Sequence, residues 1–225
     1  MIQQQLKTLP SLRLILLLLL FSHASFSTET NTASSYNEEE LVSDDDFYID
    51  EYSENRFFFS IEALLGGNTL EHITFDDGET DSIRAGSGVY LALGAAHLMF
   101  DKSIDIGIKS GILFDTVTVK NKDTHNNSVL SFVRYPLDIF GHIWLDRHII
   151  GGGISYHINP VFKSNKTSDT ASYKNALGLY AEYLYHFTGT GTAIGIKYLS
   201  IRYENADNNK SADGSGLGIT FSQIF

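Results

Sequence analysis

The sequence predicts an all-β fold, an eight-stranded antiparallel up-and-down β-barrel, on three observations. Apolar residues alternate with small or polar ones in eight segments, which is the period of a strand with two different faces. The separators between these segments alternate between short and long. Twelve Tyr, fifteen Phe and nineteen Gly beside three Pro favour strands and tight turns over helices. With an even number of strands, the first strand begins and the last strand ends on the same side, so both ends of the chain lie on the side of the short turns.

Residues 1–24 have the pattern of a secretory signal peptide. Lys7 and Arg13 precede an apolar run at 14–21, and small residues follow up to Ala24. A membrane anchor is the competing interpretation, but an anchor needs about 20 apolar residues and this run is much shorter. We therefore expect cleavage after Ala24.

Residues 25–55 form an acidic segment that is expected to be disordered. From residue 26 to 55 it has ten Asp or Glu and no Lys or Arg, and it is too poor in apolar residues to offset the entropy of ordering. Calcium binding is the alternative, but the spaced ligands and the turn Gly of a calcium loop are missing. Most of the formal charge of −11 lies here, so the rest of the chain offers no basic face for nucleic acid.

The region 56–225 is the predicted barrel domain. Its eight strands are expected at 57–67, 88–100, 103–119, 129–145, 148–158, 175–187, 192–203 and 215–225. Three separators have the length of hairpin turns, at 101–102, 146–147 and 188–191. The other four are long and polar, at 68–87, 120–128, 159–174 and 204–214. The pattern predicts short turns at one end of the barrel and long loops at the other.

The segment 103–119 shows the two faces most clearly. Apolar residues alternate there with Ser, Gly and charged residues, the apolar set being Ile104, Ile106, Ile108, Ile112 and Phe114. The same alternation fits a soluble sandwich with its charges in water and a membrane barrel with its charges inside. The signal peptide, the even count and the unequal loops favour the membrane barrel. A soluble periplasmic sandwich or lipocalin-like barrel stays as the structural alternative.

Three irregularities are expected in the strands. Pro136 predicts a bulge or kink, because proline cannot donate to a sheet ladder. Around His97 both faces are apolar, so its orientation stays open. Towards Ile201 and Tyr203 the apolar phase changes, which predicts another bulge near Ser200.

Charged residues gather on the face that a membrane barrel would turn inward. This interior set is Glu62, Asp105, Lys109, Asp115, Arg134, Asp138, His142, Glu182 and Lys197. A proton relay, an ion path or a catalytic cluster is one interpretation. We favour structural charge pairs, because eight strands leave an interior that side chains just fill, with no room for a wide channel.

Other site chemistry has little support in the sequence. Zero Cys excludes disulfides and thiolate chemistry, and the eight His are scattered without a pair at metal-ligand spacing, so neither a metal nor a cofactor is expected. The first long separator holds acids that would attract cations, but a solvated turn is favoured. These acids are Glu71, Asp76, Asp77, Glu79 and Asp81, around Gly78.

The last segment alternates apolar and small residues up to the end of the chain. Its apolar set is Leu217, Ile219, Phe221 and Phe225. The segment resembles the terminal strand of bacterial outer-membrane β-barrels, whose final Phe and preceding apolar residues are read by the barrel-assembly machinery. The resemblance implies an assembly signal at Phe225, Phe221 and Ile219. Gln223 departs from the pattern, since an apolar or aromatic residue is usual there.

Over 56–225 the chain resembles small bacterial outer-membrane barrels of the OmpA-barrel and OmpX type, through its strand pattern and terminal aromatic residue. The resemblance implies a monomer in the outer membrane, surrounded by lipid and lipopolysaccharide. The termini and the acidic segment would be periplasmic and the long loops extracellular. A resemblance of fold indicates location better than activity.

The expected role is structural or a surface interaction, without a catalytic site. Lipid A deacylases, which share such barrels, carry His-x-Ser-Asn on a late strand. Here Arg202 and Glu204 occupy the His and Ser positions, and only Asn205 fits. A lipid-modifying enzyme, either a deacylase or a palmitoyltransferase, is the alternative from another class. A narrow pore or small-solute carrier is the third.

Overall fold

The computed structural model describes residues 54–74, 80–120, 127–164 and 170–225, which lie within one unit of the chain, Tyr48–Phe225. The predicted signal peptide at 1–24, and the acidic segment up to residue 53, lie outside the described residues. No helix within the described part of the chain is long and apolar enough to cross a membrane.

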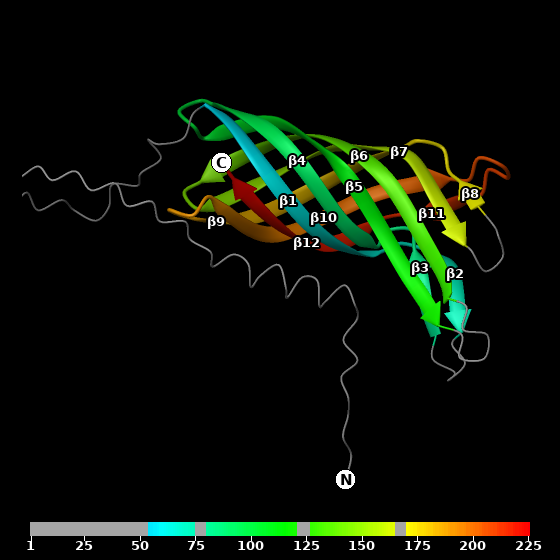
Figure 1. Ribbon diagram of the computed structural model, residues 1–225. Coiled ribbons are helices and arrows are strands. Elements are labelled where there is room, and N and C mark those ends of the chain that lie inside the picture. Colours follow the sequence, from blue (N-terminus) through cyan, green and yellow to red (C-terminus); the bar gives the residue numbers. More distant parts are fainter. Residues whose placement is uncertain (1–53, 75–79, 121–126, 165–169) are drawn as a thin grey trace, which may run out of the picture. The chain divides into compact units, whose positions relative to one another are not determined.

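Eight strands form a closed antiparallel barrel (Figure 1). They are β1 (Asn55–Gly66), β4 (Gly88–Met99), β5 (Ile104–Lys120), β6 (Asn127–Leu145), β7 (His148–Ser164), β9 (Ala176–Phe187), β10 (Thr192–Glu204) and β12 (Gly216–Ile224). Each pairs with the next, and β12 pairs with β1 to complete the ring. The predicted eight-stranded up-and-down barrel is therefore confirmed.

Closure joins two strands from opposite ends of the domain. Their outward residues pair directly, with Ile61 opposite Phe221 and Leu65 opposite Leu217. Phe225 adds a last contact, because its amide donates to the carbonyl of Phe57 at 2.9 Å. The ring of strands leaves neither β1 nor β12 with a free edge along this seam.

The three short turns lie at one end of the barrel, which we call the short-turn end. They connect β4 to β5, β6 to β7 and β9 to β10, and both Asn55 and Phe225 lie at this end because the strands alternate in direction. Asp146, Gly189 and Gly191 have positive φ, as tight hairpin turns require.

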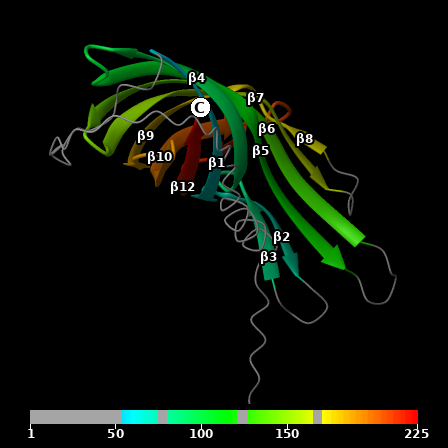
Figure 2. The same ribbon diagram turned by 60° about the vertical axis from the view of Figure 1, so that its left-hand side comes forward.

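The opposite end, the loop end, contains more strand than the sequence predicts. Four short strands lie in the predicted loops: β2 (Thr69–Thr74), β3 (Thr80–Arg84), β8 (Thr170–Ser172) and β11 (Ser211–Asp213). Strand β7 also runs to Ser164, beyond its predicted end at 158. Strands β5 and β6 continue past the end of β4, and β3 lies beside them (Figure 2). The sequence pattern did not predict these short strands, because their composition is that of loops and they do not alternate apolar with polar residues.

The bulge expected at Pro136 lies instead on the neighbouring strand. Val133 pairs with Val161 and Tyr135 with Ile158, so two residues of β7 oppose one residue of β6 at this point. The extra residue is accommodated at Asn159, whose φ is +48°. Pro136 itself keeps its place opposite His157.

The prediction of a bulge near Ser200 is wrong. Strand β10 keeps one register with β9 through Ile201, and the inward and outward sides simply alternate. Ile201 and Tyr203 point into the barrel, while Ser200 and Arg202 point outward. Near the loops the interior is apolar, whereas at mid-height the inward residues include the charged ones. We call the inward apolar residues near the loops the loop-end cluster, and it comprises Ile83, Leu130, Phe132, Phe162, Ile201 and Tyr203.

The orientation of His97, which the sequence leaves open, is outward. Its side chain is exposed, and Nδ1 lies 3.0 Å from Oδ1 of Asn55. Tyr90, Ala92 and Leu98 accordingly form the buried inward side of β4.

Two inward aromatic rings fill the space above glycines on neighbouring strands. Phe58 lies opposite Gly94, and Phe140 lies opposite Gly107. A Cβ atom on either glycine would overlap the facing ring. The two rings also contact each other edge to face, with centroids 5.7 Å apart. Glycine thus makes room for aromatic packing across the narrow interior.

Candidate functional site

The polar interior is built around two lysines at mid-height. Lys109 Nζ lies 2.6 Å from Glu62 Oε1, and Lys197 Nζ lies 2.9 Å from Glu62 Oε2. Glu62 is 0% exposed, and both lysines are buried. One carboxylate of β1 therefore joins β5 and β10, which are not its neighbours in the sheet.

Two further carboxylates complete this group. Asp138 Oδ2 lies 3.5 Å from Lys197 Nζ and 4.0 Å from Lys109 Nζ, and Glu182 Oε2 lies 3.8 Å from Lys109 Nζ. The ring of Tyr180 covers Lys197, with Nζ 4.0 Å from its centroid. We call Glu62, Lys109, Asp138, Glu182 and Lys197 the central cluster. Its three carboxylates face two ammonium groups. One buried negative charge therefore remains for a further cation to compensate.

His142 links the central cluster to the short-turn end. Its Nε2 lies 2.9 Å from Glu182 Oε1, and its Nδ1 lies 2.9 Å from Asp105 Oδ1. Trp144 donates through Nε1 to Asp105 Oδ2 at 2.6 Å. A neutral imidazole has one N–H and can donate to only one carboxylate, whereas an imidazolium donates to both. The geometry therefore fits a cationic His142.

A second arm runs from the central cluster towards the loops. Ser155 Oγ donates to Asp138 Oδ1, and His157 Nε2 lies 3.0 Å from the same hydroxyl. Tyr203 Oη lies 2.7 Å from His157 Nδ1. A Ser is activated as a nucleophile when a neighbouring His accepts its proton, but the single hydroxyl proton of Ser155 is donated to Asp138. Ser155 and His157 are also each 1% exposed, so a substrate on the protein surface does not reach them.

Arg134 closes the interior at the loop end. Its guanidinium donates to the carbonyls of Ala85 at 2.5 Å and Ser87 at 2.6 Å, and it stacks over Phe132 at 4.3 Å from the ring centroid. Arg134 is 1% exposed and Ala85 is 0% exposed. The segment after β3 is thus held across the barrel mouth, on top of the loop-end cluster.

The first and last long loops are tied together above this closure. Asn68 donates its amide to the carbonyl of Asp213 at 2.7 Å, and Asp213 donates its amide to Asn68 Oδ1 at 2.7 Å. Hydrogen bonds from the Ser215 hydroxyl and amide hold the pKa of the Asp213 carboxyl below its usual range. These contacts fix the loops at the seam between β1 and β12.

The structure places the predicted interior charges as follows. Buried and inward are Glu62, Asp105, Lys109, Arg134, Asp138, Glu182 and Lys197, whereas Asp115 is half-buried. His142 joins them. Arg134 and Asp115 belong neither to the central cluster nor to its link through His142. Sequence reasoning missed Trp144, Ser155, His157 and Tyr203, although alternation assigns Ser155 and His157 to the inward side of their strand.

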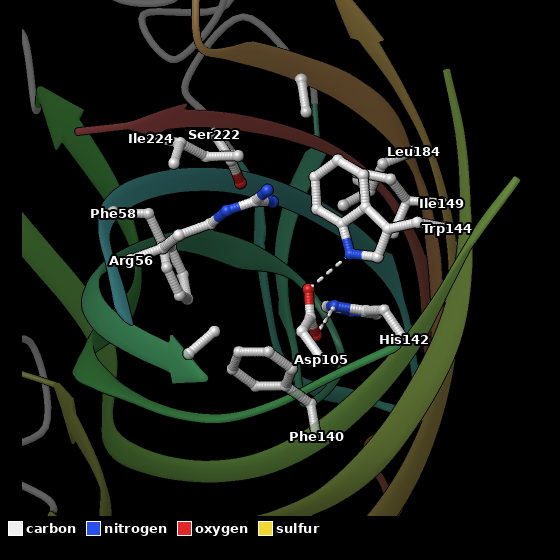
Figure 3. Close-up of a pocket in the computed structure, with 12 residues that line it drawn as sticks. Arg56, Phe58, Asp105, Phe140, His142, Trp144, Ile149, Leu184, Ser222 and Ile224 are labelled. Atoms are coloured by element: carbon white, nitrogen blue, oxygen red, sulfur yellow. Dashed lines mark hydrogen bonds and ion pairs between the residues drawn. The ribbon is translucent and has the colours of Figure 1, made fainter. Parts of the chain in front are cut away.

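A small cavity lies inside the short-turn end (Figure 3). Its volume is about 40 Å³. Arg56, Asp105, His142 and Ser222 are its polar lining, and Figure 3 shows Arg56 projecting into it. The remaining lining is apolar, formed by Phe58, Ala96, Phe140, Ile149, Leu184, Ala193 and Ile224, together with the ring of Trp144.

The outer face of the barrel has the opposite character. On β9 the outward residues run from Leu177 to Phe187. Ten residue steps at roughly 3.4 Å each, with a strand tilt of about 40°, give an apolar band about 25 Å tall. Outward charged side chains in the described parts of the eight strands are Lys163, Arg202 and Glu204, all close to the loops. Charge inside and apolar surface outside are therefore separated along the whole band.

Aromatic residues rim this band at both ends. Near the short turns the outward rings include Phe57, Phe100, Tyr183, Phe187 and Phe225. Nearer the loops they are Tyr135, Tyr156 and Tyr198. Rings at both borders of an apolar band are typical of barrels that cross a bilayer.

The similarities of this chain to known proteins are structural and lie at low sequence identity. No known protein family matches the sequence, and no curated protein matches it. Among solved structures the chain is similar to Neisserial surface protein A, with 7% identity and a TM-score of 0.44 over 77% of this chain and 98% of that chain. It is also similar to the outer membrane channel DcaP of Acinetobacter baumannii, with 6% identity and a TM-score of 0.23 over 76% of this chain and 96% of that chain. The barrel assignment itself rests on the strand pairing of this chain.

Proposed function

We propose that this chain is an outer-membrane β-barrel with a structural or surface-interaction role and a closed interior. One observation carries the proposal: charged side chains turn inward, while an apolar band about 25 Å tall with aromatic rims faces outward. A soluble barrel would need the reverse, with its charges in water. The short-turn end would then face the periplasm with both termini, and the loops would face the exterior.

Membrane location is tested by fractionation of cells that express the full chain. We expect recovery in the outer-membrane fraction, and slower migration in detergent gels after boiling than before, because heat unfolds a compact barrel. Recovery in the soluble periplasm would overturn the proposal in favour of a sandwich or lipocalin-like protein.

The proposal includes a non-conducting interior. The central cluster, the inward rings and the closure by Arg134 leave little space along the axis. In planar lipid bilayers we expect no steady channel of nanosiemens size from the purified protein. Regular openings of that size would instead support the narrow pore or solute carrier.

A lipid-modifying enzyme is the second candidate, and the site geometry argues against it. The Ser155 and His157 pair is buried inside the barrel, whereas acyl chains lie outside it. In the stretch compared with the deacylases, Arg202 is exposed, and Glu204 pairs with Lys174 at 2.6 Å. We expect no release of fatty acid from purified lipid A. Release that is lost on Ser155→Ala would establish the enzyme.

The loop end is the proposed interaction surface. It presents the β2–β3 hairpin, β8 and β11, and exposed cations near the membrane border at Lys163, Arg202 and Lys210. Lipopolysaccharide phosphates are the partner that such cations suit. The test measures lipopolysaccharide binding by the double variant Lys163→Ser/Arg202→Ser and by the unchanged chain, and weaker binding by the variant is expected. Lys102→Ser, at the short-turn end, is the control and is expected to bind normally.

A further inference from the structure

Four buried hydroxyl groups at mid-height have no hydrogen-bond partner among the described residues. They belong to Ser60, Tyr90, Tyr180 and Thr220, and none of these residues is more than 6% exposed. A buried polar group left unsatisfied costs about 1–3 kcal/mol. Such groups in folded proteins pair with protein or with ordered water. Four together indicate a partner that the chain itself does not supply.

These hydroxyls surround one ion pair. Thr220 and Tyr90 are the cross-strand partners of Glu62 on its two sides, and Ser60 precedes Glu62 by two positions on the same inward face. The fourth, Tyr180, covers Lys197, which is bound to Glu62. The unsatisfied groups therefore share one location in the barrel.

Small inward side chains connect this location to the cavity at the short-turn end. Ser222 and Ala193 line the cavity and pair with each other across β12 and β10. Ser60 is the partner of Ser222 on β1, and Thr220 follows on the same face of β12, opposite Gly195. The wall from the cavity to the central cluster thus carries hydroxyls and little bulk.

The charges of the interior indicate a neutral occupant. From the short-turn end to the central cluster, four carboxylates, of Glu62, Asp105, Asp138 and Glu182, are matched by Arg56, Lys109, Lys197 and the doubly hydrogen-bonded His142. Arg134 and the half-buried Asp115 lie nearer the loops and form one further pair of opposite charges. An additional ion would leave a buried charge uncompensated. Water both donates and accepts hydrogen bonds, and a volume of about 10–15 Å³ holds one molecule. The cavity of about 40 Å³ is large enough for on the order of three.

We propose that ordered water fills this cavity and continues along Ser222, Ser60 and Thr220 to the ion pair of Glu62 and Lys197. The line of water ends there, because Arg134 and the loop-end cluster close the other side. The barrel is then a one-ended aqueous half-channel, open at the short-turn end and sealed at the loop end. This property goes beyond the proposed function and holds whichever partner the loops bind.

Thr220→Val tests the water site through the sign of its effect. Valine has nearly the same shape without the hydroxyl. If the hydroxyl binds water, the variant loses hydrogen bonds and its urea unfolding midpoint falls. If the hydroxyl is unsatisfied, its removal raises the midpoint and overturns the proposal. Thr118→Val, on the exposed side of β5, is the control for the strand preference of valine. A high-resolution crystal structure is expected to show water within about 3 Å of Thr220 Oγ1 in the original chain only.

Ser222→Leu tests the direction of access. Leucine at this position fills the wall of the cavity, so exchange of the Lys197 ammonium protons with water, measured by NMR, is expected to slow. Ser200→Leu, on the outward side of β10, is the matched control and is expected to leave the exchange rate unchanged. Equal rates in both variants and the original chain would overturn access from the short-turn end.

Discussion

Replacing Glu62 with glutamine is expected to destabilise the folded barrel by about 3–5 kcal/mol. The substitution removes the carboxylate that both Lys109 and Lys197 approach most closely, at 2.6 and 2.9 Å. Two buried ammonium groups would then depend on the more distant Asp138 and Glu182. Urea unfolding of the protein refolded into lipid vesicles measures the loss, and Trp144, the only tryptophan of the chain, supplies the fluorescence signal.

Glu204→Gln is the matched control. Glu204 pairs with Lys174 at the same 2.6 Å, but the two side chains are 46% and 51% exposed. A surface ion pair contributes about 0–1 kcal/mol, so this variant is expected to unfold close to the original midpoint. Equal losses in the two variants would show that Glu62 contributes no more than a surface ion pair, against the structural role assigned to the central cluster.

Deleting Phe225 is expected to remove most of the protein from the outer membrane while hardly changing the stability of barrels refolded in vitro. The side chain is 72% exposed, and the residue adds one backbone hydrogen bond, from its amide to Phe57, with a contribution of about 1 kcal/mol. The stability of the folded barrel is therefore expected to depend little on Phe225. A large loss in cells would come from the proposed recognition by the assembly machinery. Quantitative immunoblots of membrane fractions, alongside urea unfolding, separate the two effects.

Gln223→Tyr is the companion variant. The Gln223 amide donates to the carbonyl of Thr190 at 2.7 Å, and its Oε1 accepts from the Thr192 hydroxyl at 2.9 Å, so the residue secures the last short turn. Tyrosine restores the aromatic pattern at the cost of these contacts, and a smaller change in assembly is expected than for the deletion. Normal assembly without Phe225 would contradict the assembly-signal hypothesis.

Alternation predicted the barrel well because a strand with two unlike faces repeats every two residues. The eight strands, the three short turns and the closure of β1 on β12 all follow from that period. The same rule failed at Ile201 and Tyr203, where the interior becomes apolar and hydrophobicity no longer distinguishes inside from outside. A phase change in hydrophobicity was thus mistaken for a change in backbone register.

The apolar–polar alternation could not predict which inward side chains contact one another. Alternation assigns Glu62 and Lys197 to the inward side, but the stagger between strands decides that they lie at the same height. Sequence order gives no indication that Arg134 would hold the segment at Ala85 and Ser87, since the link depends on the path of a long loop. The position of the bulge at Asn159 likewise depends on how two neighbouring strands share one ladder.

The packing of Phe58 over Gly94, and of Phe140 over Gly107, has an evolutionary consequence. In each pair one residue occupies the volume that a side chain on the other strand would need. A larger residue at Gly107 becomes acceptable only where position 140 loses its ring, and the same holds for 94 and 58. In an alignment of relatives these positions should therefore change in pairs, and such covariation would report strand neighbours even at sequence identities too low for similarity alone to reveal the barrel.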